Sequence, residues 1–453
     1  MNINSAWWPA QDERALLGRF YLAESASETL NVIFPFRFVY LFLVMQRPEW
    51  AVIPLLVEMV TVLLMEIPTG VVADRWGRKL SVISGGVVCA VGWAGVPLAV
   101  AMSGEAQLWA VSLCFLLSGL GQTLVSGAEQ AWVVDNLASA GRVDLVDRYF
   151  ARMRSFASLG GVVAGALALL ILLSTDVSRT LLDLLWYLAA VGLLLAVIVA
   201  TSIPEHRPAT ASGDRAVPAG VWRASLSGFR LIARSRALLM LGLAVVIGAF
   251  SGSVVDEAFD IALVTRGLDA RALAPLGIVD DLIGMIAPLI GVLLARRLGA
   301  PRLLTLFLVL PAVAVLMFFA EPGLWPVILL ALLLTFFDAV WDPVAEAYLH
   351  GLIPSDQRAT IGSIVNQVSG VAVVAGIGLF ALLLGEHSEA LQAATPDLLE
   401  AFSGGAATHV DVPAGLFGLP VTDLAIVLFI LAGLAATPLL LLGGRQSPTE
   451  KAA

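Results

Sequence analysis

Carboxylate side chains recur inside long apolar segments of this sequence, where ionisable groups are unusual. Glu24 and Glu28 stand four residues apart, so they share one face of a helix. Asp338, Asp342 and Glu346 repeat that spacing in another segment. If these segments cross a membrane, burying each charge is costly, and acids in such positions commonly line a solute or proton pathway.

Acids that are buried close together favour protonation, because burial and like charge both disfavour the ionised form. Proton coupling requires this property. The predicted coupling and substrate residues are Glu24, Glu28, Arg37, Asp256, Asp280, Asp281, Asp338, Asp342 and Glu346. For several of these acids, a structural role near a helix end is the alternative.

Arg37 is the one basic residue that lies away from the ends of the predicted spans. Two interpretations of it are open. It pairs with an acid on another helix, such as Asp256 or Asp280, or its side chain extends to the outer headgroups.

The sequence has no comparable pattern for catalysis or metal binding. Cys89 and Cys114 lie in apolar segments without metal-ligand spacing. We therefore predict no cofactor, no metal site and no enzymatic activity. The net charge of −9 argues against nucleic acid as a partner.

The chain that carries these acids is very apolar. Of its 453 residues, 59% are hydrophobic and only 13% are charged, whereas about a quarter of the residues in soluble domains are charged. This excess fits a lipid environment, where each spanning helix needs about 20 apolar residues. Because backbone groups in lipid must be satisfied within the segment, we predict an all-α membrane protein.

Twelve spans are predicted, six on each side of a polar stretch. Their approximate limits are 20–45, 50–73, 79–101, 106–130, 153–174, 181–203, 237–263, 272–295, 303–320, 324–348, 360–384 and 422–443. The polar stretch, 204–236, is interpreted as a cytoplasmic linker. It separates an N-terminal six-helix bundle, 1–203, from a C-terminal six-helix bundle, 237–453.

Basic residues predict the orientation. With a cytoplasmic N-terminus, only Arg47, Arg179, Arg266 and Arg271 fall in outer loops. Both termini are therefore expected in the cytoplasm of a multi-pass plasma-membrane protein. The stretch 385–421 contains acids but no Lys or Arg, which favours an external loop.

The loops after the second and eighth predicted spans are similar in sequence. Matching Gly77 with Gly299 also pairs Ala73 with Ala295. A weak repeat of this kind is typical of transporters built from two parallel six-helix repeats, in which the binding site lies at the interface of the halves.

The first of these loops carries a specific motif. Residues 66–79, EIPTGVVADRWGRK, resemble the signature of the major facilitator superfamily between helices 2 and 3. Shorter stretches at 126–132 and 358–360 resemble a bacterial branch with many drug-efflux-like members. The resemblance implies two pseudo-symmetric bundles of six helices, with helices 1, 4, 7 and 10 around a central cavity.

The resemblance also implies a cytoplasmic gate, which closes that side of the protein in the outward-facing state. Its residues would be Gly70, Asp74, Arg75, Gly77 and Arg78. Gly70 and Gly77 would allow close helix approach and a tight turn.

These observations predict a secondary transporter that moves a small-molecule substrate by alternating access. An acidic cavity, with Phe34, Phe36, Met285 and Trp341 nearby, favours proton-coupled export of a lipophilic or cationic compound. Core packing explains the aromatic residues equally well.

The alternatives are a metabolite, lipid or siderophore transporter of the same fold, a membrane-embedded enzyme, and a non-transporting receptor. Protons and membrane lipids are the other expected partners, and a functional monomer is expected.

Overall fold

The computed structural model describes residues 11–29, 31–45, 47–174, 179–206, 230, 232–265, 268, 272–320, 323–353 and 358–386. The chain divides into two compact units. Of the described residues, unit 1 contains those up to 206 together with 272–281, and unit 2 contains 230–268 and 282–386.

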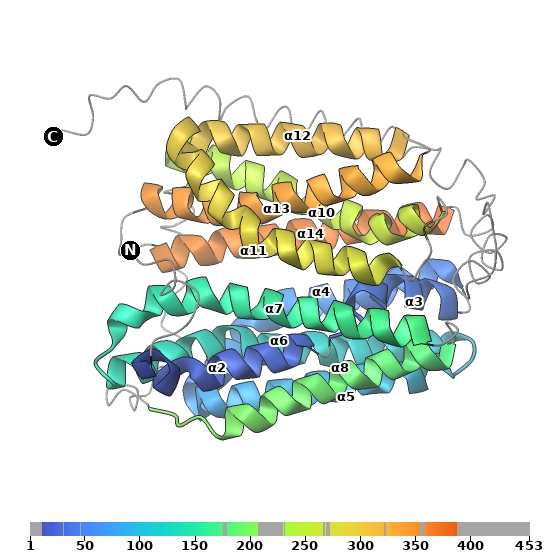
Figure 1. Ribbon diagram of the computed structural model, residues 1–453, viewed down its shortest axis with the longest axis horizontal. Helices are drawn as coiled ribbons and strands as arrows, with labels where there is room; N and C mark the ends of the chain where they lie inside the picture. The colour runs from blue at the N-terminus through green and yellow to red at the C-terminus, as the bar shows by residue number, and fades with distance from the viewer. Residues whose placement is uncertain are drawn as a thin grey trace. The chain divides into compact units, whose positions relative to one another are not determined.

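Unit 1 is built from helices alone in its described residues (Figure 1). They are α2 (Gln11–Thr29), η1 (Phe34–Phe36), α3 (Arg37–Val44), η2 (Pro48–Ala51), α4 (Val52–Trp76), α5 (Arg78–Val100), α6 (Glu105–Ser139), η3 (Val143–Leu145), α7 (Val146–Ser174) and α8 (Arg179–Thr201). Unit 1 also contains the beginning of a later helix, α11, which is described in the next paragraph. With 35 residues, α6 is about 52 Å long. It therefore extends well beyond a hydrocarbon layer of about 30 Å.

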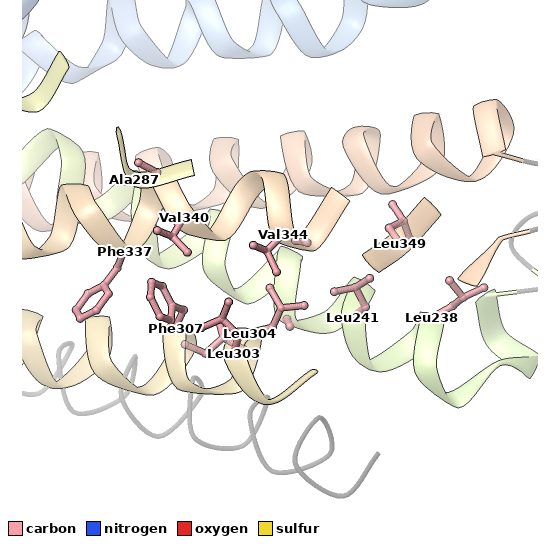
Figure 2. Close-up of a cluster of buried hydrophobic side chains, with 14 of the residues drawn as sticks. Leu238, Leu241, Ala287, Leu303, Leu304, Phe307, Phe337, Val340, Val344 and Leu349 are labelled. Atoms are coloured by element: carbon pink, nitrogen blue, oxygen red, sulfur yellow. The ribbon is translucent and has the colours of Figure 1, made fainter. Parts of the chain in front are cut away.

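The remaining helices are α10 (Arg236–Thr265), α11 (Leu273–Leu298), α12 (Ala300–Ala320), α13 (Leu324–Leu352) and α14 (Arg358–Glu386). Residues up to 281 of α11 cluster with unit 1, and the rest belong to unit 2. Figure 2 shows the apolar core of unit 2, where Leu241 of α10, Phe307 of α12 and Val340 of α13 are buried together. Apolar contacts in this core pack α10, α12 and α13 against one another.

The second to the eleventh predicted spans agree with the helices described. Eight helical segments in the described residues are long and apolar enough to cross a membrane, and α7 and α12 contain shorter apolar segments, Ser155–Ile171 and Ala300–Val315. The twelfth predicted span, 422–443, lies outside the described residues, as do most of the predicted external loop and most of the predicted linker.

The first span differs from the continuous helix predicted over 20–45. The helix α2 begins at Gln11 and ends at Thr29, and α3 begins only at Arg37. Between them, the amide of Asn31 donates to the carbonyl of Glu28 over 3.0 Å. Pro35 lies in the short 3-10 helix that follows. Because proline has no amide hydrogen and disfavours helical geometry in the preceding residue, it explains this break.

The predicted internal repeat has a matching backbone in the two units. Gly77 joins α4 to α5 with φ 116°, and Gly299 joins α11 to α12 with φ 84°. The Gly77 amide donates to Ala73 over 3.0 Å, and the Gly299 amide donates to Ala295 over 2.9 Å. Both one-residue turns thus require the positive φ that glycine adopts without strain.

Helices α5 and α6 approach each other closely through glycine. A Cβ atom added to Gly121 would lie 2.6 Å from the carbonyl oxygen of Gly85, and one added to Gly85 would lie 2.7 Å from that of Gly121. Small residues at such crossings let the backbones touch, which is how helices gain packing energy in a membrane. This contact fixes α6, which carries several of the polar side chains described next.

Candidate functional site

Three acids gather in unit 1 on two helices. Glu24 and Glu28 of α2 and Glu129 of α6 are all partly buried. Glu24 lies within electrostatic range of both Glu28 and Glu129. Among the described residues, no basic side chain forms an ion pair with any of the three. Glu129 was not among the predicted site residues.

Two adjacent glycines of α7 allow one further acid, Asp281, to come close to this group. A Cβ atom on Gly160 would lie 2.7 Å from the Cβ of Glu28, and one on Gly161 would collide with the carboxylate of Asp281. Asp281 belongs to the part of α11 that clusters with unit 1, and it interacts electrostatically with Glu28. Glycine at 160 and 161 therefore leaves the space in which these carboxylates lie.

An ion pair between a partly exposed arginine and a buried glutamate joins α3 to α4. Nη1 of Arg37 lies 3.2 Å from Oε2 of Glu58, whose side chain is 1% exposed. This pairing differs from the predicted partners of Arg37, Asp256 and Asp280. Glu58 is 21 residues away from Arg37, on the next long helix. A single sequence does not show which residues on different helices lie close together.

Two side chains of α6 also bind Glu58. Ser118 Oγ donates to Oε1 of Glu58 over 2.6 Å, and Nε2 of Gln122 donates to the same oxygen over 2.7 Å. The indole of Trp93 on α5 donates to Ser118 over 2.8 Å. The carboxylate of Glu58 is thus satisfied by donors from two other helices, as a buried charge requires.

Polar side chains continue along the faces of α4 and α6 that meet at Glu58. Ser126 Oγ donates to Oε1 of Glu66 over 3.3 Å. Ser118, Gln122 and Ser126 recur at intervals of four on α6, while Glu58 and Glu66 are eight apart on α4. That periodicity inside apolar segments is the signal by which this face can be found in the sequence.

The other predicted site residues lie on α10, α11 and α13. Asp280 is partly buried on α11, and Asp338 and Glu346 are exposed on α13. The side chains of Asp256 and Asp342 lie outside those described. The prediction that acids from the two halves share one cavity stays a prediction.

The predicted cavity aromatics divide between surface and core. Phe34 is 61% exposed, whereas Phe36 is fully buried. Trp341 packs against the apolar core of unit 2, and Met285 is partly buried on α11. Core packing therefore accounts for Phe36 and Trp341, and Phe34 is the one whose ring is largely accessible.

The gate signature surrounds the turn at Gly77. Arg78 donates to Asp135 of α6 and to the carbonyl of Ala131, the latter over 2.6 Å. Asp74 lies 4.0 Å from Arg78, and its side chain is 73% exposed. Arg75 is also exposed. The main ionic partner of Arg78 within unit 1 is therefore Asp135, not Asp74.

Gly70, the other signature glycine, is exposed, and a Cβ atom there would meet no atom of the described residues within 4 Å. The close helix approach predicted for Gly70 is therefore not seen at this position.

The chain that follows α8 is bound to the same turn. The carboxylate of Glu205 accepts from the amides of Arg78 and Lys79, over 2.8 and 3.4 Å. Nζ of Lys79 donates to the carbonyls of Thr201 and Ile203, each over 2.7 Å. A carboxylate at the start of α5 is favoured by the free amides and by the helix dipole.

A further charged cluster lies at the beginning of α2. Buried Glu13 pairs with Arg152 of α7 and accepts from the hydroxyl of Tyr21 over 3.1 Å. Asp12 pairs with Arg142 over 2.6 Å, and the hydrogen bond from this guanidinium holds the pKa of Asp12 below its usual value. These contacts bind the first turns of α2 to neighbouring parts of unit 1.

Comparison with protein families matches residues 52–377, more than half of the chain, to the Major Facilitator Superfamily. Comparison with the curated proteins finds no match.

Solved transporter structures share the fold along nearly the whole chain. The nucleoside transporter NupG is 13% identical, with 95% of this chain and 100% of that chain covered and a TM-score of 0.65. A D-xylose-proton symporter is 13% identical, with 96% and 99% covered and a TM-score of 0.63. A bacterial homologue of the iron transporter ferroportin, in an inward-facing state, is 15% identical, with 95% and 98% covered and a TM-score of 0.61. The chain therefore belongs to the major facilitator superfamily and has its all-helical, multi-pass membrane fold.

Proposed function

We propose that this protein is a secondary transporter that moves a small solute by alternating access and exports a lipophilic or cationic compound in exchange for protons. The observation that carries the proposal is the group formed by Glu24, Glu28 and Glu129, which has no basic partner among the described residues. Partly buried carboxylates without a counter-charge are costly, and either a proton or a bound cation removes that cost.

The same carboxylates give a physical reason for exchange. A carboxylate that holds a proton has lost the charge that attracts a cation, so proton binding and cation binding oppose each other. When the site opens alternately to the two sides, this competition converts a proton gradient into outward movement of the solute. The exported compound needs enough apolar surface to enter the protein from the membrane or the cytoplasm.

The proposal includes the acids of the C-terminal half. Asp338, Asp342 and Glu346 of α13, with Asp256, Asp280 and Asp281, would complete the cavity. The gate at Asp74 and Arg78 would close its cytoplasmic side. A functional monomer in a bacterial plasma membrane, with both termini in the cytoplasm, belongs to the same proposal.

Flux measurements in proteoliposomes test this function. Efflux of a fluorescent lipophilic cation should follow an imposed pH gradient and should collapse when a protonophore is added. Flux that is unchanged by both treatments would exclude proton coupling.

Variants then locate the coupling site. Glu28→Gln and Asp338→Asn should each abolish proton-driven flux while the protein still folds and inserts. Glu105→Gln, which changes an exposed acid in the first turn of α6, is the matched control. Normal flux and a normal pH profile in both site variants would remove these acids from the proposed mechanism.

A further inference from the structure

The guanidinium of Arg37 has more donors than its partners use. Among the described residues its one hydrogen-bond acceptor is Glu58, contacted through Nη1 at 3.2 Å. A guanidinium carries five N–H donors, and an optimal pair with a carboxylate is bidentate and shorter. The side chain of Arg37 is 22% exposed. Part of its donor edge is therefore accessible from outside unit 1.

Glu58 has more hydrogen-bond partners than Arg37 among the described residues. Glu58 is fixed by Ser118 and Gln122 in addition to Arg37, so its own satisfaction does not depend on the whole guanidinium. An exposed guanidinium edge is expensive in hydrocarbon. Gln122, which binds the same Glu58 carboxylate, is also polar and exposed. This face of unit 1 is thus suited to a water-filled path rather than to lipid.

An aromatic ring lies beside the free donors. The Cζ atom of Arg37 lies 5.5 Å from the ring centre of Phe34, within the range of a cation–π contact. Phe34 is 61% exposed. A ligand that reaches Arg37 at this surface would therefore meet an apolar face and hydrogen-bond donors at the same place.

The charges nearby indicate which polar group fits. Glu58 already neutralises Arg37, and Glu66 adds a further acid along the same face. An anion would gain little net attraction there, whereas an uncharged oxygen gains the hydrogen bond without a large desolvation cost.

We propose that Arg37 and Phe34 form a subsite that binds an uncharged acceptor oxygen of the transported solute, such as a carbonyl, next to one of its apolar groups. Ser118 and Gln122 act as positioning residues, because they hold the carboxylate that orients Arg37. The inference rests on the proposed function and narrows it: preferred cations carry an uncharged acceptor in addition to their charge.

A matched pair of cations tests the subsite in the purified full-length protein. Phenacyltriethylammonium carries a carbonyl where phenethyltriethylammonium carries a methylene, and the charge and ring are the same. Calorimetric titration of wild-type protein should show tighter binding of the phenacyl compound by about tenfold, which corresponds to about 1.4 kcal/mol for one hydrogen bond to a charged donor.

The double variant Arg37→Gln/Glu58→Gln should lose this preference, because it removes the guanidinium without leaving a buried unpaired charge. Glu58→Gln alone keeps Arg37 but removes the carboxylate that orients it, so the preference should weaken without being lost. The control is Arg47→Gln, since Arg47 also lies near an aromatic ring, 5.4 Å from the centre of Trp50.

The outcomes separate the two proposals. Equal binding of both cations by the wild-type protein, or a preference that survives in the double variant, overturns the subsite and leaves proton-coupled cation export standing. Binding of neither cation counts against the cationic solute class and against the subsite together. If the double variant does not fold, labelling with phenylglyoxal decides: wild-type Arg37 should be modified and protected by the phenacyl compound alone, and an unmodified Arg37 overturns the subsite.

Discussion

Replacing Asp135 by Asn should destabilise the protein more than the same replacement at Asp74, although Asp74 is the acid of the signature. Arg78 hydrogen-bonds to Asp135, whose side chain is 17% exposed. It lies 4.0 Å from Asp74, whose side chain is 73% exposed. A hydrogen bond between charged groups contributes about 1.5 to 3 kcal/mol, and an exposed pair contributes about 0 to 1 kcal/mol.

These values set the expected difference. Asparagine keeps one acceptor oxygen, so Asp135→Asn should lower the free energy of unfolding by about 1.5 kcal/mol. For Asp74→Asn we expect a loss below about 0.5 kcal/mol. The measurement is unfolding of the full-length protein by SDS in mixed micelles, followed by tryptophan fluorescence.

Double-mutant cycles with Arg78→Gln isolate each pair. The coupling energy between Arg78 and Asp135 should reach about 1 kcal/mol, and that between Arg78 and Asp74 should be close to zero. Equal coupling energies would refute the reasoning, because they would mean that geometry and burial do not distinguish the two acids. For Asp74→Asn we further expect slower transport with unchanged substrate affinity, as a role in the proposed gate requires.

Three further predictions follow from contacts in unit 1. Gly121→Val should lower the unfolding temperature by several degrees, because its side chain would overlap the backbone of α5, whereas Gly127→Ala, whose new Cβ would have no atom of the described residues within 4 Å, should not lower it. Tyr40→Phe should cost about 1.5 kcal/mol of stability in the SDS assay, because the buried Tyr40 hydroxyl donates to Asp183; a loss no larger than that of Tyr187→Phe would contradict this. Glu28→Gln should keep or raise the unfolding temperature, since it removes a partly buried charge.

The helical class and most span positions could be predicted because they depend on local composition. Apolar segments of about 20 residues have few alternatives in lipid. Gly77 and Gly299 were matched from sequence similarity alone, and the structure places both in one-residue turns with positive φ. The match holds because the turn requires glycine at one defined position.

Pairings between helices were harder to predict. The partner of Arg37 depends on how α3, α4 and α6 are rotated against one another, and a single sequence does not contain that information. The break in the helix after Thr29 was only partly predictable. Pro35 gives a local signal for it, but the high apolar content of the segment favoured a continuous helix.

The attachment of Glu205 to the start of α5 has a mechanical consequence. The carbonyl of Pro204 accepts hydrogen bonds from Trp132 and Asn136 of α6. Together with the bond to Glu205, these contacts attach the chain beyond α8 to α6 and to the start of α5. The His206 amide also donates to Asn136 of α6 over 3.0 Å, so a pull from beyond His206 would act on α6 as well as on the turn at Gly77. Shortening the chain after His206 should therefore act directly on α6 and on the signature turn.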